Sequence, residues 1–328
     1  MAKVLLVDGN NLFTIGFHGA KGYFHKERYV GGIFHFINTL RLFLEANNYD
    51  RIVVFWDGED STKARKKLFP QYKENRKNVL LPYQEESFAF QRMRVMQYLE
   101  EIFVRQCTAK ENEADDLIAY YCQLATNDNI TIFSGDRDYA QLIGEKVSLY
   151  LPDNKTLVKN GDAINFKGIQ VHHRNVLLYK TIVGDSSDNI GGISGMGVKT
   201  LKSLIPDLDK KIYSFDELFA LAKETNNKKI LEAKNKSGIL SEEFYNIVPR
   251  IIDLKNPLIN EEGKLIVEEI YSEKMNPEDR GYKNLMKLMM EDGLFKFLPK
   301  KDDGWVYFFT PFMKLIRKEK NYGRKEIN

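Results

Sequence analysis

The sequence has few cysteines, no long apolar run and little net charge, and each of these absences excludes a class of protein. Cys107 and Cys122, the two cysteines of the 328 residues, are too few for a disulfide framework and lack metal-site spacing. We therefore expect buried reduced thiols and a cytoplasmic protein. No stretch is long enough to cross a membrane, and the apolar start VLLV is too short for a signal peptide. The net charge of +3 gives no strong field over the whole molecule.

The charges that are present are unevenly distributed along the chain. Residues 61–80 contain seven Lys or Arg against one Glu, and residues 314–325 contain six against one. Acidic residues gather elsewhere, so we expect an electrically polarised molecule. A hydrophobic fraction of 43% over this length predicts a globular protein of one large or two medium domains.

Short apolar, β-branched runs predict buried strands. Three of them, KVLLVDG, RIVVFWDG and NITIFSGD, each stop at a pair of Asp and Gly, and KVSLYLP at 146–152 predicts a fourth. Helical periodicity fills the intervals at 31–48, 85–103 and 112–126. This alternation predicts a mostly parallel sheet that is covered on both faces. From about residue 170 onward the pattern predicts helices and loops without a clear strand.

Acidic residues follow the predicted strands at the point where each strand ends. Asp8, Asp57 and Asp136 come after three different strands, and the carboxyl ends of parallel strands lie along one ligand-binding edge. Helix starts reach the same edge in such a fold. Further acids fall in a helix start, in the loop after Asp136, and before the glycine-rich turn GGISGMG, and these are Glu113, Asp115, Asp116, Asp138, Asp185 and Asp188.

So many carboxylates raise one another's pKa unless cations compensate them. All-oxygen ligands suit Mg²⁺ or Mn²⁺, and nine acids are too many for one Mg²⁺. Two such ions perform phosphoryl transfer without a nucleophilic side chain, and we find no Ser or Cys with a credible His partner. The alternative is that each strand-end Asp is a helix cap and that NEADD is an ordinary acidic helix start.

The motifs LVDGNN, VVFWDG, ENEADDLIA, SGDRDYAQLI and VGDSSDNIGGISGMGVKT occur in the order found in the 5′-nuclease, or flap endonuclease, superfamily. The chain resembles most closely the stand-alone phage RNase H or 5′–3′ exonuclease enzymes and the 5′-nuclease domain of bacterial DNA polymerase I. The resemblance implies an α/β PIN-like nuclease domain at 1–168 with a central mostly parallel sheet and a helical arch at about 72–100. It also implies a helical DNA-binding region at 169–328 containing a helix–three-turn–helix at about 178–206.

The resemblance also implies two-metal hydrolysis of phosphodiesters at 5′ ends, flaps and RNA primers, with Mg²⁺ and with Mn²⁺ as a substitute. The implied first metal site consists of Asp8, Asp57, Glu113, Asp115, Asp116 and Asp136. The implied second site consists of Asp138, Asp185 and Asp188. Glu113 and Asp115 would not share a helix face, so we expect Glu113 just outside the helix or acting through water.

DNA contacts are implied for the basic stretch that follows Asp57 and for the glycine-rich turn. Lys73 and Arg76 match the basic pair at the base of the arch, where lysine offsets charge on the scissile phosphate. The other implied contacts are Arg65, Tyr72 stacking on a base, Gly195, Gly197, Lys199 and Lys202, with K⁺ in the turn. GMGVKT is no P-loop, because Val198 separates the glycine from the lysine.

The function expected from these features is removal of primers or flaps from branched, flapped or nicked duplex DNA and RNA–DNA. The expected protein is a monomer without membrane contact, with a single-strand-binding protein or sliding clamp as its partner. Two alternatives remain open: a PIN-type ribonuclease that cuts single-stranded RNA, and a non-catalytic, structure-specific DNA-binding protein. The basic run at 61–80 can also be read as a solvated face.

Overall fold

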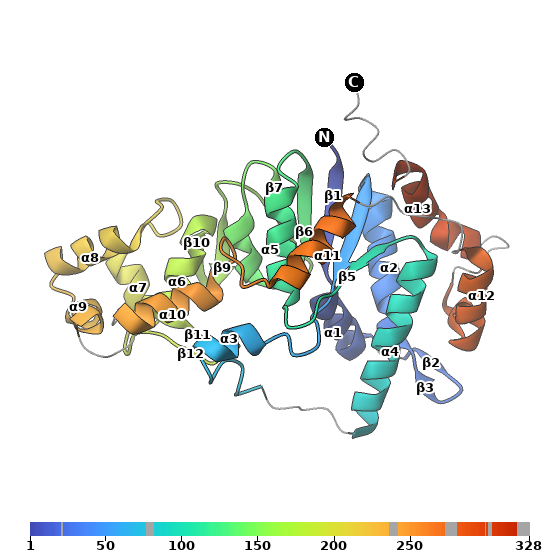
Figure 1. Cartoon of the computed structure of the whole chain (residues 1–328), viewed down its shortest axis with the longest axis horizontal. Coiled ribbons are helices and arrows are strands. Elements are labelled where there is room, and N and C mark those ends of the chain that lie inside the picture. The colour runs from blue at the N-terminus through green and yellow to red at the C-terminus, as the bar shows by residue number, and fades with distance from the viewer. Residues whose placement is uncertain are drawn as a thin grey trace.

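A central six-stranded sheet organises the chain in the computed structural model (Figure 1), which describes residues 1–20, 22–76, 82–235, 242–272, 281–298, 300 and 304–319. The strand order is β5-β4-β1-β6-β7-β8, and all neighbours are parallel except β7 and β8. The strands are β1 (Lys3–Asp8), β4 (Arg51–Phe55), β5 (Arg105–Cys107), β6 (Asn129–Phe133), β7 (Val147–Leu151) and β8 (Thr156–Val158). The predicted parallel sheet is confirmed.

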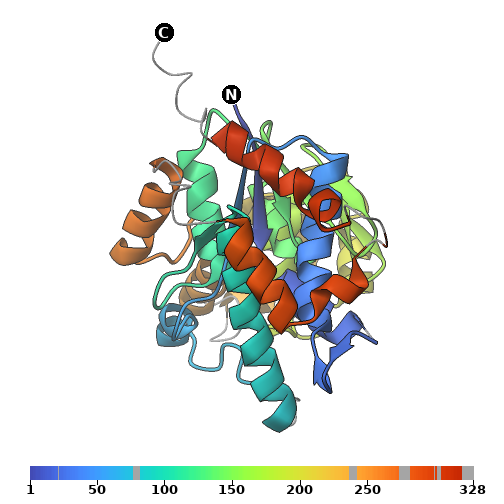
Figure 2. The same cartoon turned by 90° about the vertical axis from the view of Figure 1, so that its right-hand side faces the viewer.

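Both faces of the sheet are buried, because alternate side chains of each strand enter different cores. Leu5 and Val7 of β1 pack into one cluster and Val4 and Leu6 into the other. The first face is covered by α1 (Gly9–Gly19), α2 (Gly31–Ala46), α4 (Pro82–Glu101), α12 (Tyr282–Glu291) and α13 (Gly304–Glu319). Figure 2 shows these helices from the side on which α4 and α12 lie.

The second face is covered by α5 (Ala114–Leu124), η1 (Arg137–Leu142) and α11 (Glu261–Ser272). The same core continues away from the sheet (Figure 1) into α6 (Val176–Val183), α7 (Val198–Leu204), α8 (Phe215–Glu224) and α9 (Lys228–Asn235). The same core contains residues of β1 and of α8, so the parts before and after residue 168 share one core. The division into two domains at that point stays a prediction.

A third, smaller core connects the basic stretch to the C-terminal half. It joins Tyr72 and Ile190 to Val248 of α10 (Glu242–Ile252), and Leu68 of α3 (Lys63–Leu68) packs against it. The remaining elements are η2 (His173–Asn175) and η3 (Leu294–Phe297). This core holds α3 beside the turn that carries Asp188.

Short antiparallel pairs also occur among the described residues, and two begin before residue 170: β2 (Phe24–His25) with β3 (Arg28–Tyr29), and β9 (Ala163–Phe166) with β10 (Ile169–His172). The expectation of helices and loops without a clear strand from about residue 170 missed the third pair, β11 (Gly184–Asp185) with β12 (Ile190–Gly191). Strands of two to four residues are too short to give a periodic pattern in the sequence. The last pair closes the loop between Asp185 and Asp188.

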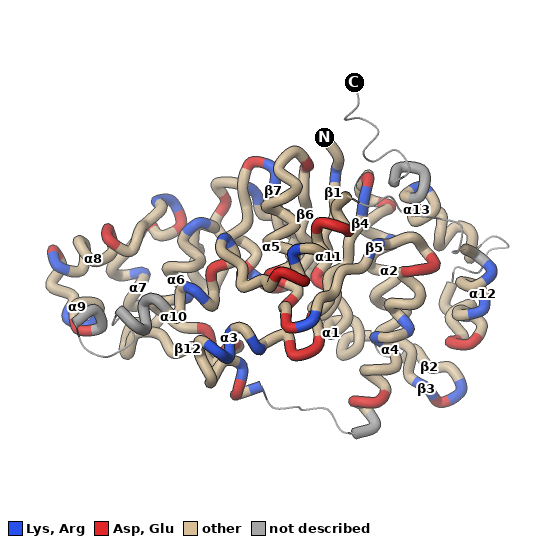
Figure 3. Tube along the Cα trace, viewed as in Figure 1, with Lys and Arg blue, Asp and Glu red and all other residues tan. Residues whose placement is uncertain are grey.

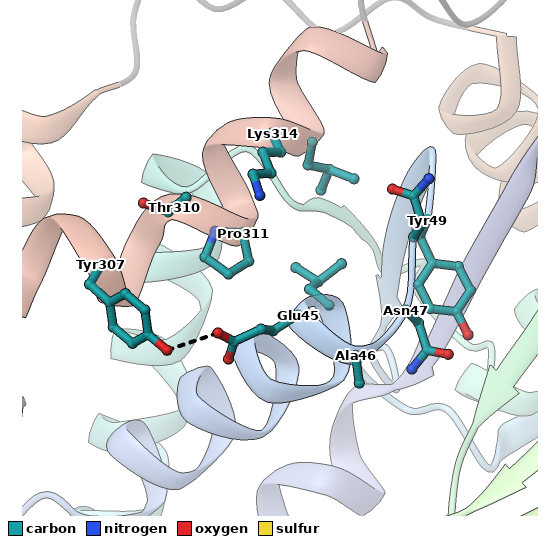
Figure 4. A pocket seen from close by; sticks show the side chains of 11 residues that line it. Glu45, Ala46, Asn47, Tyr49, Tyr307, Thr310, Pro311 and Lys314 are labelled. Atoms are coloured by element: carbon teal, nitrogen blue, oxygen red, sulfur yellow. Dashed lines mark hydrogen bonds between the residues drawn. The ribbon is translucent and has the colours of Figure 1, made fainter.

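A cleft of about 330 Å³ lies between the end of α2 and the middle of α13 (Figure 4). The hydroxyl of Tyr307 donates to Glu45 Oε1 across it at 3.0 Å. The lining residues Asn47 and Tyr49 precede β4, so the cleft lies at the amino ends of the strands, opposite the strand-end acids. None of the described helices is both long and apolar enough to cross a membrane.

Candidate metal centre

The three strand-end acids lie together at the carboxyl edge of the sheet. Asp8 is the last residue of β1, and Asp57 and Asp136 follow β4 and β6, the two strands that pair with β1. Asp8 Oδ1 accepts the backbone N–H of Asn11 at 3.0 Å and thereby caps α1. Asp57 Oδ1 accepts the N–H of Ala114 at 2.8 Å. The capping alternative is therefore true of these acids, but each cap engages one of two carboxylate oxygens.

The carboxylates at this edge carry more negative charge than the basic side chains near them neutralise. The pKa of Asp8 is raised from 3.8 to about 7, mainly by burial and also by the charges of Asp57 and Asp136, which together outweigh the lowering effect of the N–H of Asn11. Burial likewise raises the pKa of Asp57, with Asp115 adding to the shift. In the described part of the chain, no Lys or Arg forms an ion pair with Asp8, Asp57 or Asp136. The other oxygen of Asp8, Oδ2, accepts from the hydroxyls of Ser134 at 3.0 Å and Tyr139 at 3.3 Å, so these acids are open to a cation because no described basic side chain neutralises them, and not because their oxygens lack partners.

The acids at the start of α5 have different surroundings. Glu113 is the N-cap residue and lies outside the helix, as expected, while Asp116 is 1% exposed. Arg65 NH1 contacts Glu113 Oε2 at 2.7 Å and Asp116 Oδ2 at 2.5 Å. The second oxygen of Asp116 accepts from Arg65 NH2 at 3.1 Å and from the N–H of Leu258 at 2.9 Å. Both oxygens of Asp116 are thus engaged within the protein.

Three residues of the expected site lie in surroundings that the sequence did not indicate. Asp116 lies within 4.8 Å of Glu113 and Asp115 and forms an ion pair with Arg65, and its role as a metal ligand stays a prediction. Arg65 is 3% exposed and cannot touch DNA from this position. Tyr72 is 2% exposed, and its hydroxyl donates to Glu113 Oε2 at 3.0 Å, so its ring is packed inside the protein and not presented to a base.

A second acidic group consists of Asp138, Asp185 and Asp188, whose oxygens lie within 4.8 Å of one another. Lys180 of α6, which the sequence reasoning missed, forms ion pairs with Asp138 and with Asp185 Oδ2, the latter at 2.5 Å. Burial raises the pKa of Asp138 to about 8, with the charge of Asp136 adding to it. The pKa of Asp185 falls to about 2, because Lys180 and the donors of Ser187 outweigh burial.

Lys73 and Arg76 connect the two acidic groups. Lys73 Nζ pairs with Glu113 Oε1 and lies 3.9 Å from Asp188 Oδ1, while Arg76 NH2 lies 3.0 Å from the same Asp188 oxygen. Burial lowers the pKa of Lys73, but the carboxylates around it reverse this, and the net shift is upward. Figure 3 shows the basic α3 segment between acidic segments near β12 and α1. The basic run is therefore more than a solvated face, although Arg76 is itself exposed.

The glycine-rich turn lies between α6 and α7, within the predicted helix–three-turn–helix. Gly195 has φ +73°, a conformation that favours glycine, whereas Gly197 has φ −69° and open space around a Cβ, so nothing in this turn requires glycine at 197. Lys199 is exposed. Lys202 is turned back, because its Nζ donates to Pro206 O at 2.5 Å and to Asp209 Oδ1 at 3.1 Å.

The strand-end acids and Asp115, which we call the first group, offer a set of oxygen ligands that fits a divalent cation. Asp8, Asp57, Asp115 and Asp136 present carboxylate oxygens from three strand ends and one helix start, with no His or Cys, which suits hard ions. Asp115 has one distant basic neighbour, Arg65 NH2 at 3.6 Å. The second group also offers only oxygens, but the ammonium of Lys180 shares them. The two clusters whose oxygens lie within 4.8 Å of one another, Glu113–Asp115–Asp116 and Asp138–Asp185–Asp188, are compatible with divalent metal, although Arg65 and Lys180 form ion pairs with them. Among the described residues, the strand-end acids Asp8, Asp57 and Asp136 are the less neutralised.

A mostly parallel sheet with carboxylates at its carboxyl edge and helices on both faces defines an α/β nuclease of the PIN-like class. Residues 3–169 match the family of the 5′–3′ exonuclease N-terminal resolvase-like domain. The chain therefore belongs to the 5′–3′ exonuclease family, and it is a metal-dependent nuclease.

Relatives in several bacteria agree with this assignment. The chain is 30% identical over 265 residues to a 5′–3′ exonuclease of Halalkalibacterium halodurans, which covers 76% of this chain and 84% of that protein. It is 29% identical over 242 residues to a 5′–3′ exonuclease of Mycoplasmopsis pulmonis, covering 73% and 78%. It is 27% identical to DNA polymerase I of Bacillus subtilis over 264 residues, covering 75% of this chain and 28% of the polymerase.

A solved structure shows the same fold. The flap endonuclease D15 of bacteriophage T5, in a complex with DNA and metal ions, is similar with a TM-score of 0.58 and 18% identity over 88% of this chain and 99% of that one. The expectation of a fold like that of the stand-alone phage enzymes is thereby confirmed.

Proposed function

We propose that this chain is a structure-specific 5′-nuclease that hydrolyses phosphodiesters of flapped, branched or nicked duplex DNA, and of RNA in RNA–DNA, to remove primers or flaps. The observation that carries the proposal is the group of Asp8, Asp57, Asp115 and Asp136, whose oxygens face one edge largely without basic partners. The T5 enzyme of the same fold was solved with DNA and metal ions.

The proposed cofactor is Mg²⁺, two ions in all, with Mn²⁺ as a substitute. Bound there, such ions supply activation of water and stabilisation of charge on the scissile phosphate. Asp8, Asp57, Asp115 and Asp136 would hold the first ion, and Asp138, Asp185 and Asp188 would hold the second in competition with Lys180. Glu113 and Asp116 are proposed to act indirectly, since they fix Lys73 and Arg65 at the edge of the site.

Lys73 is the proposed catalytic cation. Its Nζ lies between Glu113 and Asp188, at the boundary of the two acidic groups, where a phosphate bridging both groups would meet it. The upward net shift of its pKa keeps the ammonium charged at neutral pH. Arg76, with its exposed side chain, is proposed to hold a neighbouring phosphate, and Lys199 to contact the duplex backbone.

The expected arch at about 72–100 contains α4, but residues 77–81 lie outside the described residues, as do 320–328 of the basic tail. A monomeric state and a single-strand-binding protein or sliding clamp as partner stay predictions. So does K⁺ in the glycine-rich turn.

The test is cleavage of labelled 5′-flap, nicked and RNA-primed duplexes and of single-stranded RNA, in Mg²⁺ and in EDTA. We expect cuts near the 5′ end or flap junction, lost in EDTA and in Asp136→Asn, with binding to the flap retained. Preferential cutting of single-stranded RNA would favour the PIN-type ribonuclease instead. Binding without cleavage in either Mg²⁺ or Mn²⁺ would favour the non-catalytic alternative.

A further inference from the structure

The ammonium group of Lys229, a residue of α9, lies against the glycine-rich turn between α6 and α7. Lys229 donates from Nζ to the carbonyl oxygen of Gly195 at 2.8 Å. A Cβ placed on Gly195 would lie 2.8 Å from Lys229 Nζ and 3.0 Å from Cε, so the end of the lysine side chain rests directly on the turn. The contact joins two segments that are 34 residues apart.

The turn suits a bound monovalent cation poorly in this chain. Such an ion needs several carbonyl oxygens that converge and are free to coordinate it. The carbonyl oxygen of Gly195 already accepts from Lys229, so it is not free to coordinate an ion. An ammonium at this position also repels any other cation that approaches the same oxygens. The K⁺ expected from the sequence resemblance therefore conflicts with the side chain that is already there.

We propose that Lys229 takes the place of a monovalent cation at this turn and that α9 thereby becomes part of the duplex-binding surface. The inference rests on the proposed function, because it concerns how the chain grips DNA. A lysine ammonium has three N–H donors, and one of them is used on Gly195. Lys229 is exposed, so the remaining donors are open to a phosphate oxygen.

A tethered charge differs from a bound ion in one measurable way. Its occupancy does not depend on which salt is in solution, whereas a K⁺ site empties when K⁺ is replaced by a cation too large to enter it. The affinity for duplex DNA should therefore not depend on which monovalent cation is present at fixed ionic strength. Removal of the ammonium should create a dependence on K⁺, because the turn carbonyls are then open to it.

The experiment measures duplex binding by fluorescence anisotropy in EDTA, which prevents cleavage, in KCl and in tetramethylammonium chloride at equal ionic strength. The full-length wild-type protein should give the same Kd in both salts, within about twofold. Lys229→Met, which keeps the aliphatic stem, should bind roughly five- to tenfold more weakly in tetramethylammonium, as expected for a lost charged hydrogen bond, and recover in KCl. Lys229→Gln should behave in the same way.

Lys228→Met is the matched control, since Lys228 is the exposed neighbour on the same helix. It should change Kd equally in the two salts, through loss of a general phosphate attraction. Wild-type binding that is several-fold tighter in KCl would overturn the proposal, as would Lys229 variants with no preference for K⁺. Failure of the wild-type protein to bind duplex at all would instead refute the proposed function. Circular dichroism melting of each variant confirms that the proteins compared are folded.

Discussion

Replacement of Asp8 by Asn tests whether the strand-end acids form a cation site whose carboxylates destabilise the folded protein when no cation is bound. Asp8 is 9% exposed, and its pKa is raised from 3.8 to about 7, with burial as the largest cause. Between these two values the folded protein keeps a proton that the unfolded chain has lost. Stability from this group is therefore fully present below pH 3.8 and is lost as the pH rises towards 7.

The shift from 3.8 to about 7 corresponds to roughly 4 kcal/mol at 1.36 kcal/mol per pKa unit. Asn has no charge to lose, and its Oδ1 can still accept from Asn11 to cap α1. In the absence of divalent ions, the free energy of unfolding of Asp8→Asn should thus be close to that of the wild type near pH 4. Above pH 7 it should exceed the wild-type value by about 2–4 kcal/mol, once about 1 kcal/mol is subtracted for the altered contact with Ser134.

Added Mg²⁺ should reverse this order at pH 8. Binding to the folded state stabilises the wild type by RT ln(1 + [Mg²⁺]/Kd), while the variant has lost a ligand and gains less. Urea unfolding followed by circular dichroism at pH 4 and pH 8, with EDTA or Mg²⁺, measures all four conditions. Asp216→Asn is the control, because Asp216 is exposed in the first turn of α8. A wild type and variant with equal stability at pH 8 in EDTA would refute the reasoning.

Four further substitutions probe the basic side chains of the site. Lys73→Met should lower kcat on a flap substrate by about 10²–10³-fold with little change in KM, and an unchanged kcat would remove Lys73 from catalysis. Arg65→Met should lower the free energy of unfolding by about 3–5 kcal/mol, because it leaves buried carboxylates unpaired. Arg76→Met, at an exposed position, should cost less than about 1 kcal/mol in the same urea titration. Lys180→Met should increase the rise in Tm produced by Mg²⁺, since the ammonium no longer competes for Asp138, and a smaller rise would contradict that competition.

The sequence predicted where Asp8, Asp57 and Asp136 lie in the fold because local patterns place them at strand ends. A buried parallel strand is a short apolar run, and its carboxyl end is the residue where the run stops. Asp8, Asp57 and Asp136 could therefore be assigned to one edge before any coordinates were known. The order of the strands was not predictable in the same way, because it depends on which runs pair across intervals of many residues.

The sequence did not predict how the basic residues would be used. Arg65 and Tyr72 were expected at the DNA surface, but both are buried against acids that lie 51 and 41 residues away. Lys180 sits in an apolar helical stretch with no local feature to distinguish it from a solvent-facing lysine. Lys229 reaches a turn that precedes it by 34 residues. Periodicity carries no information about such pairs, since it describes only neighbours along the chain.

By itself, the sequence determined the parallel α/β fold, the acid-bearing edge and the presence of a glycine turn ahead of a short helix, because each follows from local spacing and residue type. Only the tertiary structure decided which carboxylates are neutralised and which remain open. That outcome depends on distances of a few ångströms between segments far apart in the chain, where burial makes the presence or absence of one ammonium or guanidinium decisive.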